Sequence, residues 1–164
     1  SWWLDAGIKM GPMEFGGGFF WLEGDDDPND DEAVGAFGVG EDFEPYFLLF
    51  SEDVGLLWNT SGVNNGTNGT SGYQSAYLRG AFNITDTMKI GGVLGYIKAD
   101  EMELKSVDDE LGWEFDLNFE WKFMDNIAYV VDAGYLKAGD YWDDISNGED
   151  NDVWGVRHML VINW

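Results

Sequence analysis

The sequence predicts an all-β chain, an antiparallel transmembrane β-barrel whose meander shows about seven strands in 164 residues. Three observations predict this class: apolar and polar residues alternate, the alternating segments are long, and short and long connections alternate between them. A soluble strand averages about five or six residues, whereas a tilted strand needs about nine to eleven to cross a bilayer. We therefore interpret residues 1–164 as a single transmembrane β-barrel domain.

The clearest strand runs over residues 111–123, where large apolar residues from Leu111 to Phe123 occupy every second position against glycine, acidic, amide and lysine residues. This period of two gives a strand two chemically opposed faces. A soluble β-sandwich would also produce it, but the strand length favours a membrane. Looser alternation marks six further strands, at 2–10, 13–21, 76–84, 88–96, 127–135 and 154–164.

The connections between these strands are strictly asymmetric. Turns at 11–12, 85–87 and 124–126 are short, whereas the connections 23–75, 98–110 and 139–152 are long. Residues 23–53 hold twelve acids, 98–110 six and 139–152 six, so 24 of the 32 acids lie in the long connections. Outer-membrane barrels have short periplasmic turns and long extracellular loops. The three long connections are therefore expected to be extracellular loops, the first of them long and acidic.

Aromatic residues gather at both ends of the predicted strands, as expected for girdles at the two bilayer interfaces. At the long-loop end they are Trp2, Trp21, Tyr96, Trp113, Trp142 and Trp154, and at the short-turn end Phe82, Trp121, Phe123 and Trp164.

Composition excludes several classes of protein. With 32 acidic and 8 basic residues the formal net charge is -24, which argues against a nucleic-acid partner. Aromatic residues make up 16% of the chain, too many for disorder. Cysteine is absent, so disulfides, thiolate metal sites and cysteine nucleophiles are excluded. No continuous apolar window is long enough for a transmembrane helix.

The last strand ends on an aromatic residue after an alternating apolar pattern formed by Trp154, Leu160, Ile162 and Trp164. This pattern resembles the C-terminal assembly signal of Gram-negative outer-membrane β-barrel proteins, and with the preceding hairpins the chain resembles the C-terminal part of a general bacterial porin. The resemblance implies an outer-membrane location, passive diffusion of solutes, contacts with outer-membrane lipid and lipopolysaccharide, recognition by the barrel-assembly machinery, and a homotrimer.

Strand parity adds an expectation about the whole barrel. Bacterial single-chain barrels have an even number of strands with both ends in the periplasm. Seven strands counted back from Trp164 would start outside the cell, so we expect the C-terminal portion of a larger even-stranded barrel. The alternative is a complete small barrel with an eighth strand at 43–50 or 54–58.

Parity also predicts which charged residues face the lumen. Charges on the lipid face cost about 2–4 kcal/mol at mid-membrane, so the charged positions of the strands should point inward. The expected pore-lining residues are Asp5, Lys9, Glu14, Arg79, Lys89, Glu114, Asp116, Glu120, Lys122, Asp132 and Arg157. Acids slightly outnumber bases, which predicts a mild cation preference. The alternative is a small, plugged barrel whose charges pair internally.

The stretch 43–58 is unusually apolar for a loop. A long loop with its own apolar cluster is expected to pack against another protein surface and not to extend into solvent. By resemblance to porin loops, we expect it to fold into the barrel mouth as a constriction. The candidate residues are Phe43, Tyr46, Phe47, Phe50 and Trp58. A contact between subunits is the rival interpretation.

An acidic run at 25–32 offers Asp25, Asp27, Asp30 and Asp31 as candidate metal ligands. It fails as an EF-hand loop because Asp30 stands where glycine is required and Ala36 where glutamate is required. A loosely bound divalent cation, bridging to lipopolysaccharide phosphates, is the remaining metal hypothesis, and no other cofactor is expected.

Together these patterns favour a porin-like outer-membrane channel for ions and small hydrophilic solutes. The alternative is a structural barrel that sheathes or anchors a partner, such as a periplasmic electron-transfer protein. No catalytic residue is expected: His158 is the lone histidine, parity places it on the lipid face, and no nucleophile accompanies it. An outer-membrane hydrolase is therefore the least favoured hypothesis.

Overall fold

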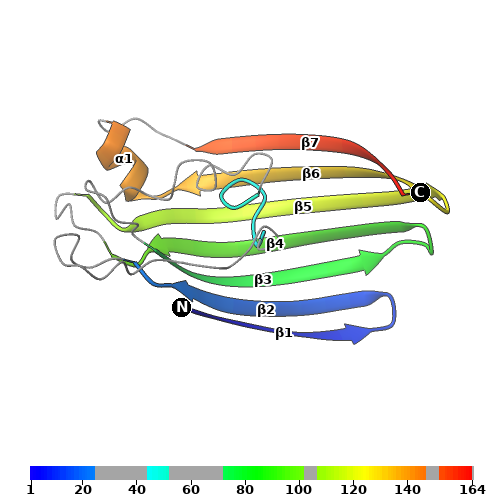
Figure 1. Cartoon of the computed structure of the whole chain (residues 1–164), viewed down its shortest axis with the longest axis horizontal. Coiled ribbons are helices and arrows are strands. Elements are labelled where there is room, and N and C mark those ends of the chain that lie inside the picture. The colour runs from blue at the N-terminus through cyan, green and yellow to red at the C-terminus, as the bar shows by residue number, and fades with distance from the viewer. Residues whose placement is uncertain (25–43, 52–71, 102–106, 147–151, 164) are drawn as a thin grey trace.

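The computed structural model describes residues 1–24, 44–51, 72–101, 107–146 and 152–163 as one antiparallel sheet with a short helix (Figure 1). The strands follow each other in space as in sequence, which confirms the predicted all-β meander of seven strands. They are β1 (Trp2–Met10), β2 (Met13–Leu22), β3 (Tyr73–Asn83), β4 (Met88–Ala99), β5 (Glu110–Met124), β6 (Ile127–Ala138) and β7 (Val153–Ile162), and the helix α1 (Asp140–Ser146) precedes β7.

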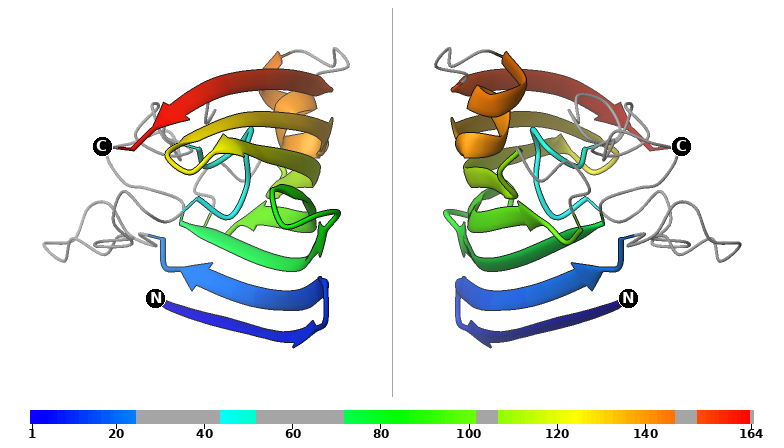
Figure 2. Two further views of the ribbon diagram at one scale, coloured as in Figure 1. Left: turned by 90° about the vertical axis from the view of Figure 1, so that its right-hand side faces the viewer. Right: turned by 90° about the vertical axis from the view of Figure 1, so that its left-hand side faces the viewer.

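The register gathers polar side chains on one face of the sheet. In an antiparallel ladder, directly opposed residues point to the same face. Arg79 of β3 lies opposite Gly16 of β2 and Val93 of β4, and Val93 lies opposite Asp116 of β5. Figure 2 shows that the sheet is curved and that residues 44–51 lie within its concavity. Since these residues bond to Asp116, the polar face is the concave one.

The convex face is apolar and exposed. Leu4, Leu78 and Trp154 are 64%, 68% and 75% exposed, respectively, and large apolar neighbours continue the surface along the strands. A contiguous apolar surface of this extent is unusual on a soluble protein but is required where strands contact lipid. The distribution of side chains is the one that the two-residue period predicted.

Buried apolar side chains are on the concave side, toward the end that carries the long connections. They come from the sheet and from residues 44–51, among them Phe20, Tyr46, Leu49 and Leu136. The strands therefore do not enclose a core of their own. They are packed from inside by a segment inserted between β2 and β3.

The described strands extend beyond the limits that the alternating pattern predicted. Residues 73–75, expected in a loop, belong to β3 because Tyr73 and Gln74 pair with Ala99 and Lys98 of β4. Ladder hydrogen bonds thus continue past the point where side-chain alternation weakens. The register between β4 and β5 also shifts: Ile97 pairs with Gly112 but Lys98 pairs with Glu110, so the alternation is broken at Leu111.

The expected loop 139–152 contains α1, which the sequence analysis did not predict. Asp140 and Asp143 lie in its first turn, where acidic side chains interact favourably with the helix dipole and stabilise the helix. Trp142 donates its indole N–H to the carbonyl of Leu111 at 2.8 Å, and Tyr141 is buried in the apolar cluster. No helix among the described residues is long and apolar enough to span a membrane.

Residues 44–51 form turns rather than a strand, which removes that part of the proposed eighth strand. The other part, residues 54–58, lies outside the described residues.

Candidate functional site

The concave face carries all eleven charged residues that parity assigned to the lumen. They are spread over every strand: Asp5 and Lys9 on β1, Glu14 on β2, Arg79 on β3, Lys89 on β4, Glu114, Asp116, Glu120 and Lys122 on β5, Asp132 on β6 and Arg157 on β7. Register brings several of them into direct opposition, including Lys89 with Glu120 and Asp132 with Arg157.

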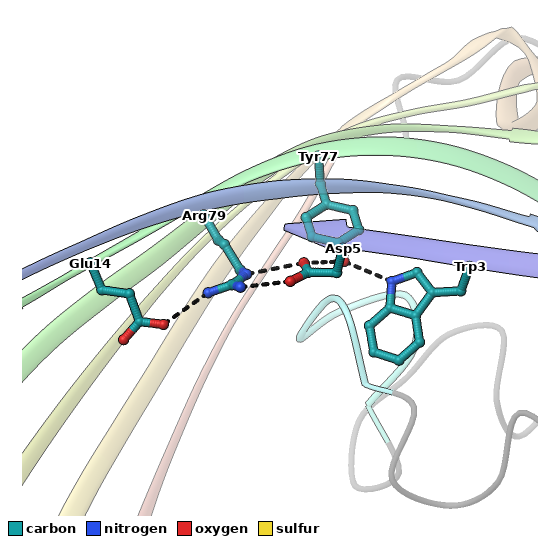
Figure 3. Close-up of polar contacts among 5 residues, drawn as sticks. All are labelled: Trp3, Asp5, Glu14, Tyr77 and Arg79. Atoms are coloured by element: carbon teal, nitrogen blue, oxygen red, sulfur yellow. Dashed lines mark hydrogen bonds and ion pairs between the residues drawn. The ribbon is translucent and has the colours of Figure 1, made fainter. Parts of the chain in front are cut away.

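Arg79 is the centre of a polar network that joins β1, β2 and β3 (Figure 3). Its Nη2 lies 2.6 Å from Asp5 Oδ1 and its Nε 3.1 Å from Asp5 Oδ2, a bidentate pair. Its Nη1 donates to Glu14 Oε1 at 3.1 Å. Tyr77 donates its hydroxyl to Asp5 at 2.8 Å, and Trp3 donates its indole N–H to the Tyr77 oxygen at 2.9 Å. Bidentate charged bonds fix orientation as well as position.

Two glycines let the Arg79 guanidinium lie against the backbone. A Cβ at Gly16 would lie 2.9 Å from Arg79 Cζ and 2.8 Å from the Ala6 carbonyl oxygen, and one at Gly7 would lie 3.0 Å from Arg79 Nη2. Real Cβ atoms do not approach so closely, so any larger residue at Gly16 would displace the guanidinium. These glycines, which contribute nothing to the alternating pattern, are therefore part of the arginine site.

A second arginine pair lies across the sheet on β6 and β7. Arg157 Nη2 lies 2.8 Å from Asp132 Oδ2, and Asn118 donates its amide to the other oxygen of Asp132 at 2.6 Å. The Arg157 guanidinium also lies 5.2 Å from the centroid of the Phe47 ring, within cation–π range. Lys122 lies 3.0 Å from Glu120 on the same face. Whether the barrel is plugged, as the alternative interpretation holds, stays a prediction.

Two buried carboxylates of β5 hold residues 44–51, hereafter the inner segment, against the concave face. Glu114 accepts hydrogen bonds from the backbone amides of Leu48 and Leu49, the second at 3.1 Å. Asp116 accepts from the amide of Phe47 at 3.0 Å. Glu114 is completely buried. Together, Glu114 and Asp116 give three consecutive backbone amides of a non-helical segment their hydrogen-bond partners.

Aromatic packing completes this attachment. Phe50 makes edge-to-face contacts with Phe20 at 5.7 Å and with Tyr73 at 5.3 Å, and Tyr46 makes one with Tyr77 at 6.2 Å. The Tyr46 hydroxyl is hydrogen-bonded to Ser75, and burial raises the pKa of Tyr46 above its usual range. Gly95 makes room for Tyr46, because a Cβ there would overlap the tyrosine ring.

Three of the five residues proposed for a constriction, Tyr46, Phe47 and Phe50, are thus buried on the concave side of the sheet. Phe43 and Trp58 lie outside the described residues, as do the candidate metal ligands Asp25, Asp27, Asp30 and Asp31. Of the assembly-signal residues, Trp154, Leu160 and Ile162 lie on the convex face of β7. Trp164 lies outside the described residues, and a role in assembly stays a prediction.

Two hollows lie on either side of Glu44 and Pro45, the first described residues of the inner segment. One, of about 370 Å³, we name the Trp3 hollow; its lining includes Trp3, Asp5, Glu44, Pro45, Tyr77 and Arg79. The other, of about 180 Å³, includes Asp116, Asn118, Asp132 and Arg157 in its lining. Each hollow therefore presents one arginine–aspartate pair.

Trp3, Tyr77 and Glu44 were not predicted as site residues from the sequence. Trp3 and Tyr77 share the parity of Asp5 and Arg79, so the alternation itself could have placed them on the polar face. They were missed because only charged residues were counted among the expected pore-lining residues. Glu44 lies in a loop without periodicity, and no local signal marks it.

Comparison with known protein families gives one match. The family model described as oligogalacturonate-specific porin protein (KdgM) matches residues 23–163. No curated protein and no solved structure matches the chain.

Proposed function

The chain belongs to the oligogalacturonate-specific porin family, and from this premise we propose that its concave face is the wall of an aqueous channel narrowed by the inner segment. The protein is an outer-membrane porin of a Gram-negative bacterium, which confirms the predicted location, the porin resemblance and the transmembrane β-barrel class. Such porins are typically non-enzymatic channels through which small solutes diffuse.

The observation that carries the lumen proposal is the separation of the two faces of the sheet. Charged side chains from all seven strands share the concave face, whereas residues such as Leu78 and Trp154 expose apolar surface on the other. Lipid can cover the apolar convex face but not the charged concave face. The two faces are therefore both accommodated when water fills the concave side and lipid covers the convex side.

The inner segment supports the proposed constriction. Its backbone amides are bonded to Glu114 and Asp116, so it crosses the concave side at the level of these carboxylates. Glu44 is exposed on this segment and borders both hollows. A solute passing along the concave face would meet this carboxylate. The same segment disfavours the sheath alternative, because it occupies part of the space that an enclosed partner protein would need.

We further propose a mild cation preference for this channel. Oligogalacturonate, after which the family is described, is a polyanion, so this preference would set the chain apart from that description. In this chain Arg79 is bound by Asp5 and Glu14, and Arg157 is bound by Asp132. Paired arginines contribute little net positive potential. The excess of acids on the concave side then includes Glu44 of the inner segment.

The test is the reversal potential of the full chain in planar bilayers under a gradient of potassium chloride. We expect discrete open channels and a reversal potential on the cation-selective side, reduced by Glu44→Gln. Asp86→Asn is the matched control, because Asp86 is exposed in the short turn between β3 and β4. An anion-selective reversal potential would contradict the ion preference alone, whereas a complete absence of conductance would contradict the channel.

A further inference from the structure

Trp3 is placed unlike the other strand tryptophans of the described residues. Trp2, Trp21, Trp113, Trp121 and Trp154 lie on the convex face, where lipid covers an indole. Trp3 lies on the polar concave face and is 58% exposed. Large apolar surface facing water is unfavourable by roughly 25 cal/mol per Å². An exposed indole in a water-filled lumen is therefore a candidate surface for a ligand.

The orientation of this indole is fixed. Its N–H donates to the Tyr77 hydroxyl at 2.9 Å, and that hydroxyl donates to Asp5 at 2.8 Å. Figure 3 shows the ring beside the carboxylate of Asp5, with Arg79 beyond it. The hydrogen bond engages one edge of the indole, so the ring cannot turn freely about its side-chain bonds.

The remaining lining of the Trp3 hollow combines apolar surface with both kinds of hydrogen-bonding group. Pro45 and Val93 add apolar atoms to the indole. Asp5 and Glu44 offer acceptors, and the guanidinium of Arg79 offers donors. The volume of about 370 Å³ falls in the range of small-molecule sites, roughly 300–1,000 Å³.

We propose that the Trp3 hollow is a binding subsite for one ring of a neutral oligosaccharide in transit, an inference that rests on the channel function proposed above. A pyranose ring has an apolar face of C–H groups, which matches the face of Trp3. Its hydroxyl groups each donate and accept, so they match a lining with both carboxylates and a guanidinium. The ring stacks on Trp3, and its hydroxyls bond to the Asp5–Arg79 pair at the rim.

The charge state of the hollow favours an uncharged sugar over an acidic one. Both Asp5 and Glu14 already bond to Arg79, and Glu44 adds a further negative charge. A sugar carboxylate would have to displace one of these acids and leave it without its partner, which is costly. A hydroxyl can join the existing pair without breaking it. A small organic cation is the competing ligand, and the experiment distinguishes it.

The side chains are held before any ligand arrives. The bidentate bonds to Asp5 fix Arg79, which lies over the backbone of Gly7 and Gly16. A site of this kind loses little conformational entropy on binding, which allows a single ring to bind measurably. Binding at one point would raise the local solute concentration at the inner segment.

The test measures sugar binding to the full chain in two ways, by blockade of single-channel current in planar bilayers and by titration calorimetry in detergent. The probes are maltohexaose and cellohexaose as neutral sugars, hexagalacturonate as an acidic sugar, and choline as an organic cation. We expect at least one neutral sugar to bind, and to bind more tightly than hexagalacturonate or choline.

The variants assign this binding to the indole. Trp3→Ala should weaken it by about tenfold, since it removes the stacking surface, while Trp3→Phe should retain part of it. Trp2→Ala is the matched control, because Trp2 is the adjacent residue on the opposite face and its replacement should leave binding unchanged. Trp2→Ala should also keep the open-channel conductance of the parent, because Trp2 lies outside the lumen.

Three results would overturn the proposal: no binding of either neutral sugar to conducting channels, binding that Trp3→Ala leaves unchanged, or tighter Trp3-dependent binding of hexagalacturonate or choline. Failure of the channel function is recognised separately, because sugar-free channels would then not conduct. Calorimetry would still report whether the hollow binds a sugar.

Discussion

Replacing Glu114 with alanine should release the inner segment from the concave face and widen the channel. Glu114 is completely buried and accepts the amides of Leu48 and Leu49. Alanine removes both acceptors and leaves the amides without partners in a site closed to water. Only the Phe47 amide would then keep its carboxylate, that of Asp116.

The loss is large compared with what holds the segment in place. A buried donor left unsatisfied costs about 1–3 kcal/mol, so two amides cost about 2–6 kcal/mol. Burial of Phe47, Leu48, Leu49 and Phe50 contributes about 1.5–3 kcal/mol each. Ordering eight residues opposes this by about 1–2 kcal/mol each, a comparable total. The carboxylate bonds therefore decide whether the inner segment stays docked.

Two measurements check this expectation. Single-channel conductance should rise in Glu114→Ala. Because the sequence contains no cysteine, Ser51→Cys gives a single reporter thiol at a position that is 1% exposed. A water-soluble maleimide should label it slowly in the parent and at least tenfold faster with Glu114→Ala, since 1.4 kcal/mol already shifts an equilibrium about tenfold.

Glu120→Gln is the matched control, because Glu120 lies on the same face of β5 but pairs with Lys122 and not with the inner segment. It should change neither conductance nor labelling. Unchanged conductance and unchanged labelling in Glu114→Ala would refute the role assigned to this carboxylate.

Three further expectations follow from other parts of the sheet. Gly95→Ala should displace Tyr46, because the added methyl group overlaps the tyrosine ring. Single-channel conductance should therefore rise, as we expect for Glu114→Ala. Leu78→Lys should destabilise the barrel by about 2–4 kcal/mol in lipid vesicles, measured by urea unfolding, since a charge would enter the lipid face. The hydrogen bond from Tyr135 holds the pKa of Asp152 below its usual value, so Asp152 stabilises the fold above about pH 4 and this contribution fades as pH falls through the lowered pKa. Asp152→Asn should therefore lower the denaturant midpoint at pH 7, and by less at pH 3.

Each of these expectations has its own control. Gly91→Ala should leave conductance unchanged, because a Cβ there stays 3.4 Å from its nearest neighbour. Leu78→Met should leave stability nearly unchanged; equal stability of the lysine variant would place Leu78 away from lipid. A stability difference in Asp152→Asn that grows on acidification would contradict the sign derived for Asp152.

Alternation along the chain predicted most of the sheet. In β5 the side chains from Trp113 to Trp121 keep two distinct faces in the structure, and the polar one is concave. Leu111 departs from the predicted face, because the register shifts there and its side chain is buried in the apolar cluster. Parity works because a strand points successive side chains to opposite sides. It therefore placed Glu114 and Asp116 on the correct face without knowledge of their partners.

The partners themselves could not be predicted from local pattern. Glu114 and Leu48 are separated by 66 positions, and nothing near either residue indicates the other. The apolar stretch 43–58 did predict a packed segment, of which residues 44–51 are described. Which strands this segment packs against depends on the long-range register of the sheet, and local pattern does not show it. Likewise α1 has seven residues, too few for a helical period to emerge.

The central claim is that the concave face of the sheet meets water and the convex face meets lipid. Single cysteines at Leu117, Asn118, Phe119 and Glu120 of β5 test it directly, since the sequence has no cysteine of its own. In outer-membrane vesicles, a charged thiol reagent should label cysteines at positions 118 and 120, while cysteines at 117 and 119 stay unlabelled. The same reagent should reduce the current through channels that carry cysteine at 118 or 120. Labelling that does not alternate along these four positions would contradict the assignment of the two faces.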